Sequence, residues 1–312
     1  IRIFENMLNA VPNALPKLLK TLPNMPSRTC KAALLSLLAL FSLSTQAQVS
    51  FDGKFEQGAL IRGKAPAGTQ VSLNGEAVKV TPDGHFAFGF DRDAQLTQEL
   101  RLMYPDGLTE VKPLNIKKRE YNIQNVKGIS NKIMKPDPVA QERAAKDTAQ
   151  VKAARGTFSE QIAFLQSFIW PLTGRISGVY GSQRIYNDVP GNPHFGVDVA
   201  AKTGTVVVAP ADGVISLSVP DMFYSGGTMV IDHGYGVSSS FLHLSKLYVN
   251  AGETVKQGQA VAEVGATGRA NGPHLDWRLN WFQMRLDPTT IVPPMATVLA
   301  AEQAQKVQKV AK

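Results

Sequence analysis

The sequence predicts a mainly β protein: a small N-terminal β-sandwich, a helical linker and a C-terminal antiparallel β barrel or sandwich. Three observations lead to this prediction. Short alternating apolar runs fill two long stretches of the chain, turn dipeptides such as Asn74-Gly75 and Asp83-Gly84 separate these runs, and the stretch between them is rich in helix-forming residues. The chain has 312 residues, of which 44% are hydrophobic and 19% charged, a composition typical of about two globular domains.

Residues 1–47 have the features of an export signal. Arg28 and Lys31 flank the start of an apolar run, 32–43, that ends in small residues. A basic start, a short apolar stretch and a small-residue cleavage site make up a secretory signal peptide, and a membrane span needs about 20 apolar residues. Met25 is better placed to start translation than Ile at position 1, so the residues before it are interpreted as upstream sequence. We expect an exported protein of the bacterial periplasm or cell envelope, with no stable membrane span after signal removal.

The next two segments are expected to support the site rather than to form it. Residues 48–118 contain short runs at hairpin spacing, which predict the β-sandwich, and they hold no cluster of titratable side chains. Residues 119–168 form the linker. From 139 to 166 the linker is dense in Ala, Gln, Glu and Lys, which favours a helix, with a break expected near Gly156.

The second β-rich domain is predicted at 169–294. Two of its segments, 204–214 and 252–261, share a pattern of Gly, a Val-containing run and a turn. This repeat predicts one strand–turn–strand unit used twice, which fits an antiparallel barrel or sandwich. The tail, 295–312, is rich in Ala, Gln and Lys and is expected to be helical or disordered.

Charge and cysteine content exclude several classes of function. The chain has 33 Lys and Arg against 25 Asp and Glu, and part of this excess lies in the signal segment. The remaining positive charge is too weak to indicate a nucleic-acid partner. The one cysteine, Cys30, also lies in the signal segment. We therefore expect no disulfide and no cysteine nucleophile, and any metal must be bound by His, Asp or Glu.

Three histidines of the second domain stand beside potential metal ligands. His194 and Asp198 are four residues apart, and His274 and Asp276 are two apart. On an extended strand, even spacing places side chains on one face. His243 lies between apolar neighbours that are expected to face the other way. Each pair alone is explained more simply by a hydrogen bond. Together, such nitrogen and oxygen ligands suit Zn²⁺, which as a catalyst takes three protein ligands and leaves one position open.

These residues stand within longer motifs that together resemble the lysostaphin/LytM-type zinc metallopeptidases, which cut peptide bonds in peptidoglycan. The resemblance covers about 171–294, and the region before it resembles the N-terminal regions of exported bacterial members. The motifs that carry it are GNPHFGVD (191–198), VAPADG (208–213), IDHG (231–234), FLHLS (241–245), GATG (265–268) and GPHLD (272–276).

The resemblance implies a role for five residues. His194 and Asp198 match two zinc ligands, His243 and His274 match the catalytic histidines, and the third ligand position falls on Asp276. The family's usual residue there is His, so Asp276 is a departure. Asp can replace a His that coordinates through Nδ1, because both place a donor atom three bonds from Cα. A second carboxylate makes the Zn²⁺ site less positive and its bound water less acidic.

Two functions remain open at this point. The first is a zinc-dependent endopeptidase that hydrolyses peptide bonds of peptidoglycan stem peptides or cross-links. The second is a degenerate, metal-free LytM-type module that binds the cell wall or activates another peptidoglycan hydrolase. Four of the five positions keep the family's residue and the fifth, Asp276, is another ligand type, so catalysis is the favoured hypothesis. Peptidoglycan is the expected partner in either case.

Overall fold

The computed structural model describes residues 49–127 and 137–310. The predicted signal peptide at 1–47 lies outside the described residues, as does the middle of the linker. The mainly β fold class is confirmed, and the described residues contain two α-helices. No helix among them is both long and apolar enough to cross a membrane.

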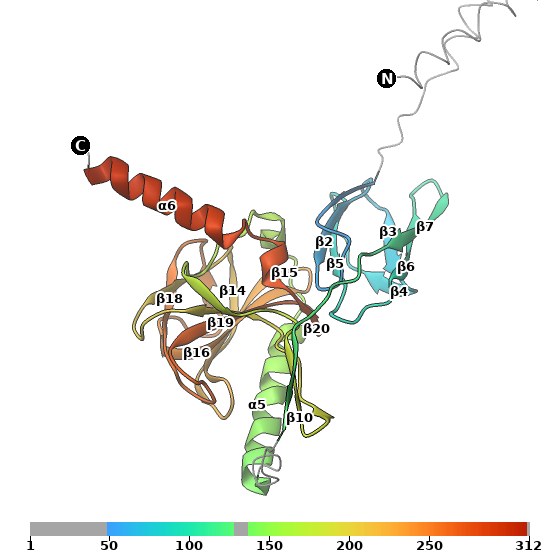
Figure 1. Cartoon of the computed structure of the whole chain (residues 1–312). Coiled ribbons are helices and arrows are strands. Elements are labelled where there is room, and N and C mark those ends of the chain that lie inside the picture. The colour runs from blue at the N-terminus through green and yellow to red at the C-terminus, as the bar shows by residue number, and fades with distance from the viewer. Residues whose placement is uncertain (1–48, 128–136, 311–312) are drawn as a thin grey trace, which may run out of the picture. The chain divides into compact units, whose positions relative to one another are not determined.

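Two antiparallel sheets form the N-terminal module, blue to green in Figure 1. Their facing sides bury a cluster of apolar side chains that includes Phe86, Phe88 and Leu100. Asn74 and Gly75 form the two-residue turn of one hairpin, both with positive φ as this turn requires. The sheet orders are β1–β2–β5 and β4–β3–β6–β7, with β1 (Ser50–Asp52), β2 (Leu60–Lys64), β3 (Gln70–Leu73), β4 (Glu76–Val78), β5 (His85–Gly89), β6 (Thr97–Met103) and β7 (Thr109–Asn115).

The linker contributes a strand that the sequence did not predict. β8 (Ile123–Val126) pairs in parallel with β10 (Gln183–Tyr186) of the second domain. Most of its side chains are exposed. Without a buried face the strand lacks the apolar alternation by which strands are predicted from sequence.

The predicted linker helix is α5 (Pro138–Gly156). Its N-cap, Asp137, accepts a hydrogen bond from the backbone N–H of Ala140, and proline occupies the first helical position. The helix ends at the expected break, Gly156, so the prediction of helix up to residue 166 is wrong. The rest of the segment has no regular secondary structure apart from the short 3₁₀ helix η1 (Ala163–Leu165).

The C-terminal domain is built on one strongly curved antiparallel sheet (Figure 1). The two similar segments predicted from the sequence pair with each other, since β13 pairs with β18 and β14 pairs with β17. The chain ends in α6 (Met295–Val310). The remaining elements are β9 (Arg175–Gly178), β11 (Val189–Pro190), β12 (Val197–Ala200), β13 (Val206–Val208), β14 (Gly213–Met222), β15 (Gly226–Gly234), β16 (Val237–Leu247), β17 (Thr254–Val255), β18 (Ala260–Val264), β19 (His274–Trp281), β20 (Met284–Leu286) and η2 (Pro288–Thr290).

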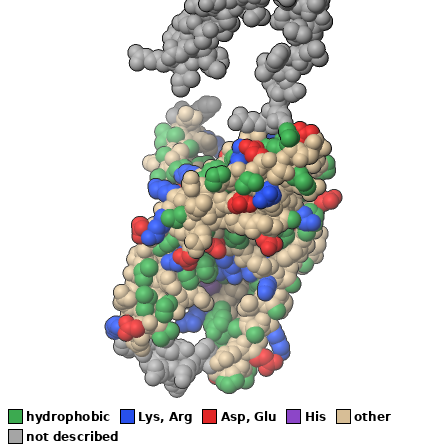
Figure 2. Space-filling view, turned by 90° about the vertical axis from the view of Figure 1, so that its right-hand side faces the viewer, with side chains coloured by type: hydrophobic (Ala, Val, Ile, Leu, Met, Phe, Trp, Pro, Cys, Tyr) green, Lys and Arg blue, Asp and Glu red, His purple; other side chains and the backbone are tan. Residues whose placement is uncertain are grey.

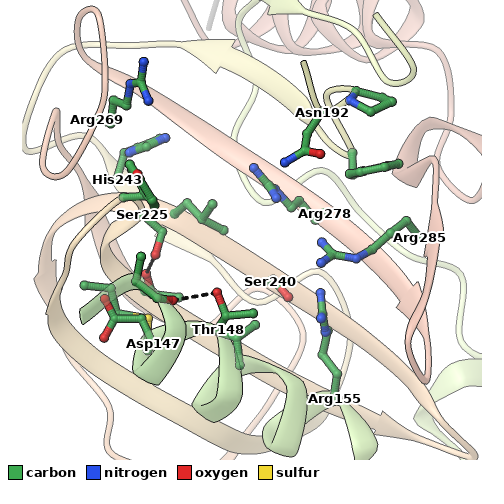
Figure 3. A pocket seen from close by; sticks show the side chains of 18 residues that line it. Asp147, Thr148, Arg155, Asn192, Ser225, Ser240, His243, Arg269, Arg278 and Arg285 are labelled. Carbon is green, nitrogen blue, oxygen red and sulfur yellow. Dashed lines mark hydrogen bonds between the residues drawn. The ribbon is translucent and has the colours of Figure 1, made fainter. Parts of the chain in front are cut away.

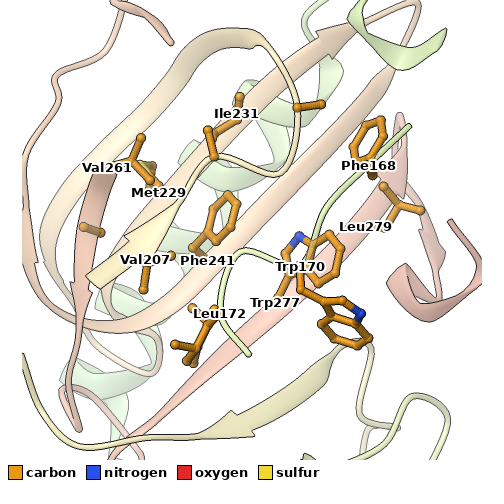
Figure 4. Close-up of a cluster of buried hydrophobic side chains, with 14 of the residues drawn as sticks. Phe168, Trp170, Leu172, Val207, Met229, Ile231, Phe241, Val261, Trp277 and Leu279 are labelled. Atoms are coloured by element: carbon orange, nitrogen blue, oxygen red, sulfur yellow. The ribbon is translucent and has the colours of Figure 1, made fainter. Parts of the chain in front are cut away.

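Large apolar side chains fill the concave side of this sheet (Figure 4). Phe241 on β16 and Trp277 on β19 are completely buried, and the Trp277 ring packs edge-on against Trp170 with ring centroids 5.6 Å apart. Each full burial of this kind stabilises the fold by about 1.5–3 kcal/mol. The sheet is therefore a rigid base for the polar side chains on its other face.

Two arginines, one in the N-terminal module and one at the start of the linker, contact the C-terminal domain. Buried Arg92 donates through Nε to the carbonyl of Gly181, at 2.9 Å. Arg119 forms an ion pair with buried Asp287, at 2.8 Å. Gly181 in turn donates its N–H to the carbonyl of His194, at 2.7 Å. The N-terminal module thus reaches the loop that carries one of the predicted metal ligands.

Candidate metal centre

Two neighbouring strands place the two carboxylates of the predicted ligand set face to face. Asp198 on β12 and Asp276 on β19 are direct partners in the antiparallel register. His194 lies in the loop before β12 rather than on that strand, so the expectation of one continuous strand is wrong. Its backbone is held by hydrogen bonds with Gly181 and Ser182. The three residues nevertheless meet: one ligand atom of each lies within 4.8 Å of the other two.

The imidazole of His194 points its Nε2 at both carboxylates. Nδ1 lies 3.3 Å from the carbonyl of Val179, which can only accept, so Nδ1 carries the proton. Nε2 lies 3.1 Å from Asp198 Oδ1 and 3.5 Å from Asp276 Oδ2. A carbonyl on Nδ1 that fixes the tautomer and leaves Nε2 free is the usual arrangement around a metal-ligating histidine.

Two glycines provide the space for the ligand carboxylates. A Cβ at Gly178 would lie 2.1 Å from Asp198 Oδ2, and a Cβ at Gly196 would lie 2.4 Å from Asp276 Oδ1. Neither position tolerates a side chain without displacing a carboxylate. Gly196 lies inside the first motif (191–198), so the motif could have pointed to it. Gly178 lies outside that motif and could not have been found in this way. Both were missed as site residues.

The donor set fits a divalent metal ion. His194 Nε2 and Asp198 Oδ1 are buried and face each other at 3.1 Å, and apart from this ion pair neither atom has a hydrogen-bond partner among the described residues. A bound metal ion would satisfy both atoms. Burial lowers the pKa of an imidazole, but here the carboxylates of Asp198 and Asp276 outweigh it and raise the pKa of His194 to about 10. The site thus attracts positive charge strongly, and a bound metal would replace that proton.

His243 and His274 form a pair of imidazoles beside the ligand group. Their ring centroids are 4.8 Å apart. Each ring faces a backbone carbonyl through Nδ1 at 2.8 Å, that of Thr267 for His243 and that of Gly272 for His274. Both Nε2 atoms are therefore free of these contacts, and that of His274 lies 3.8 Å from Asp198 Oδ1.

His243 is also held in an unusual backbone conformation. Its φ is +63°, a left-handed value that is rare for a histidine and costs free energy. The residue lies where the pairing of β16 is irregular, and its N–H donates to the carbonyl of Ser225 at 2.8 Å. Burial lowers the pKa of His243, which keeps its imidazole neutral at pH 7. Strain of this kind, maintained by surrounding contacts, concentrates at functional sites.

Arg278 is a site residue that the sequence analysis missed. Its guanidinium donates to both oxygens of Asp276, with Nη2–Oδ2 at 2.6 Å and Nε–Oδ1 at 3.0 Å. Burial would raise the pKa of Asp276, but Arg278 and His194 lower it well below its usual range. The two-residue spacing on a strand places both side chains on one face, so the pattern could have revealed the pair.

The remaining histidine of this domain lies apart from the site. His233 is fully buried; its Nδ1 lies 2.7 Å from the carbonyl of Asp212 and its Nε2 lies 2.9 Å from the hydroxyl of Ser239. Both ring nitrogens are thus satisfied within the fold, which is the arrangement of a structural histidine.

Comparison with known proteins identifies this domain. Residues 192–288 match Peptidase family M23, a range that includes all five predicted site residues. A Haemophilus influenzae protein named as an uncharacterized metalloprotease is 35% identical over 124 residues, which is 40% of this chain and 23% of that protein. The peptidoglycan DD-endopeptidase ShyC of Vibrio cholerae is 35% identical over 143 residues, 45% of this chain and 32% of the relative. The chain thus spans no more than about a third of either relative.

A solved structure extends the likeness beyond the matched range. A Pseudomonas aeruginosa protein assigned to peptidase M23 is 27% identical, with a TM-score of 0.60 over 77% of this chain and 95% of that one. The similarity therefore includes segments outside residues 192–288. Together with the motifs and the geometry of the donor set, these matches show that the C-terminal domain of this chain is a peptidase family M23 domain of the lysostaphin/LytM type, with residues suited to a metal cofactor.

Proposed function

We propose that this protein is a zinc-dependent endopeptidase that hydrolyses peptide bonds of peptidoglycan stem peptides or cross-links in the bacterial cell envelope. The observation that supports this most directly is the convergence of three ligand atoms within 4.8 Å, two of them buried and, among the described residues, partnered only by each other. The names of the matched relatives supply the substrate class, since they include peptidoglycan DD-endopeptidases.

In this proposal His194, Asp198 and Asp276 hold the metal. When bound, Zn²⁺ supplies Lewis-acid chemistry, polarising the scissile carbonyl and lowering the pKa of water. Arg278 compensates for the replacement of the family's usual histidine by Asp276, because its guanidinium cancels one of the two carboxylate charges. The site then keeps a single net positive charge, as it would with a neutral histidine in place of Asp276.

His243 and His274 move protons. Neutral His243 offers the lone pair of Nε2 as an acceptor for a proton of the attacking water. His274, with its ring next to that of His243, is placed to donate from Nε2 to the developing oxyanion or to the leaving amine when the ring is protonated, because its Nδ1 proton is already donated to the carbonyl of Gly272. Because a carbonyl holds each Nδ1, neither ring is free to turn its Nε2 away from the site.

One observation favours the second candidate function, a metal-free module that binds cell wall or activates another hydrolase. Arg278 already donates to both oxygens of Asp276 and competes with any metal for that carboxylate. Buried ion pairs of this geometry can satisfy a carboxylate without a metal.

Metal analysis and peptidoglycan digestion separate the two functions. For protein purified without added metal, the proposal expects about one bound zinc per chain and release of peptide fragments from purified sacculi. His194→Ala should lose the metal and the activity, and His243→Asn should lose the activity alone. Wild-type protein that holds no metal and releases no fragments would support the binding module. Digestion by either variant at the wild-type rate would contradict the assignment of its residue.

A further inference from the structure

Four arginines line a pocket beside the metal centre. This arginine pocket has a volume of about 600 Å³, and its walls include Arg155, Arg269, Arg278, Arg285 and His243. Figure 2 shows the corresponding hollow, with a histidine side chain among basic side chains. Asp147 is the only carboxylate among the described lining residues, and it accepts a hydrogen bond from the N–H of Phe223 at 2.7 Å. The pocket therefore carries a strong excess of positive charge.

Two of these arginines lack a counter-charge. Arg155 comes from α5 and Arg285 from β20, and in Figure 3 their guanidinium groups point toward one another, with Arg278 close by. Among the described residues neither Arg155 nor Arg285 forms an ion pair, whereas Arg278 is paired with Asp276. Arg155 is only 5% exposed, its Nη2 donates to Gln283 at 3.2 Å, and its buried Nε has no hydrogen-bond partner.

The electrostatics of the pair agree with this geometry. Burial, with repulsion from Arg278, lowers the pKa of Arg155 to about 10. Burial, with repulsion from Arg155 and Arg278, lowers the pKa of Arg285 to about 9. Both groups remain charged at pH 7, so the fold bears the cost of two adjacent cations, Arg155 buried and Arg285 half-buried. An anion in the pocket would remove this cost.

We propose that the arginine pocket is a subsite for a carboxylate group of the peptide substrate, bound by Arg155 and Arg285. A planar guanidinium matches the two oxygens of a carboxylate. Arg278 lines the pocket and is bonded to Asp276, which belongs to the predicted ligand set. A substrate carboxylate bound in the pocket would therefore lie next to the reacting peptide bond. The peptide nature of the ligand rests on the proposed function, but the affinity for an acidic peptide can be measured without turnover.

The first test needs no variant. Calorimetric titration of the wild-type protein compares the peptide N-acetyl-L-Ala-γ-D-Glu-L-Lys-D-Ala with the same peptide whose carboxylates are amidated. The acidic peptide should bind at least tenfold more tightly, and added salt should weaken its binding. Equal affinity of the two peptides would overturn the proposal whatever the variants do.

The second test uses variants to show which arginines bind the carboxylate of the peptide. Arg155→Gln and Arg285→Gln keep polar side chains, and each should weaken binding of the acidic peptide at least fivefold while leaving the amidated peptide unaffected. Arg143→Gln is the matched control, because Arg143 lies on the same helix but pairs with exposed Asp221. An equal loss for both peptides, or an equal loss in the control, would contradict a carboxylate subsite.

Metal content and kinetics separate this proposal from the proposed function. The two pocket variants should retain the zinc content of the wild type and should raise KM for an acidic peptide substrate far more than they lower kcat. Peptide discrimination without any hydrolysis would overturn the enzymatic function and support the subsite. Hydrolysis without any preference for the acidic over the amidated peptide would support the enzymatic function and overturn the subsite.

Discussion

Arg278 donates hydrogen bonds to both carboxylate oxygens of Asp276 from two positions further along the same strand. The Asp276 side chain is buried, at 3% exposed, and that of Arg278 is half-buried, at 23%. Asp276 belongs to the predicted ligand set and Arg278 lines the arginine pocket, so this contact joins the two sites. The positive charge of Arg278 also cancels the negative charge of Asp276, so the predicted third ligand has no net charge together with its partner.

Replacing Arg278 by methionine should destabilise the metal-free protein by about 1–3 kcal/mol, because the buried carboxylate of Asp276 would keep only His194, 3.5 Å away, as a counter-charge. Zinc would then supply the missing positive charge, so added zinc should raise the urea unfolding midpoint more in Arg278→Met than in the wild type. Arg101→Met, which breaks an ion pair with half-exposed Glu99, should cost no more than about 1 kcal/mol. An equal effect of zinc on Arg278→Met and wild type would show that Asp276 does not contact the metal.

His243→Asn should lower the rate of peptide hydrolysis by about 10²–10⁴-fold while leaving bound metal and thermal stability near wild type. Asparagine tolerates the left-handed φ of +63° at this position. His243→Val should lose activity to the same extent and also lower the unfolding free energy by about 1–3 kcal/mol, because a β-branched residue is strained there. Activity retained by the asparagine variant would remove His243 from the mechanism.

Gly178→Ala should abolish metal binding, since the new methyl group would lie 2.1 Å from Asp198 Oδ2 and push the carboxylate aside. Zinc content by mass spectrometry is the direct measurement. Gly156→Ala is a suitable control, because its Cβ would meet nothing closer than 3.4 Å. Normal zinc content in Gly178→Ala would mean that Asp198 binds from another rotamer.

Stability should fall on acidification because of His233. Burial lowers the pKa of this imidazole from 6.5 to about 4. Between these values the unfolded chain binds a proton that the folded protein does not, so unfolding becomes more favourable as pH falls. The contribution is fully present above pH 6.5 and is lost by pH 4, a change of about 3 kcal/mol. In urea titrations His233→Gln should show a correspondingly flatter pH dependence, and an unchanged slope would exclude His233 as its source.

The sequence predicted the parts of the site that lie within one strand or one short motif. His274 and Asp276 lie on β19 as their spacing requires, and the turn at Asn74-Gly75 forms the expected hairpin. Such features depend on local backbone geometry, which neighbouring residues determine.

Features that join distant segments could not be predicted in this way. Arg155 and Arg285 come from a linker helix and a short edge strand, and no local pattern relates them. β8 lacks apolar alternation, so its pairing with β10 depends on partners sixty residues away in the chain. His194 reaches Asp198 from a loop, where the rule for side chains on one face of a strand does not apply.

The contact of Arg92 with Gly181 bears on how the protein can be dissected. Gly181 is hydrogen-bonded to His194, so removing the first β module would expose the backbone that orients a ligand side chain. A fragment cut at the bounds of the matched range, 192–288, would contain all five predicted site residues and yet lack the contacts that hold His194 in place. The smallest part of this molecule that keeps the geometry of the donor set should therefore be larger than the matched range 192–288 and begin upstream of residue 92.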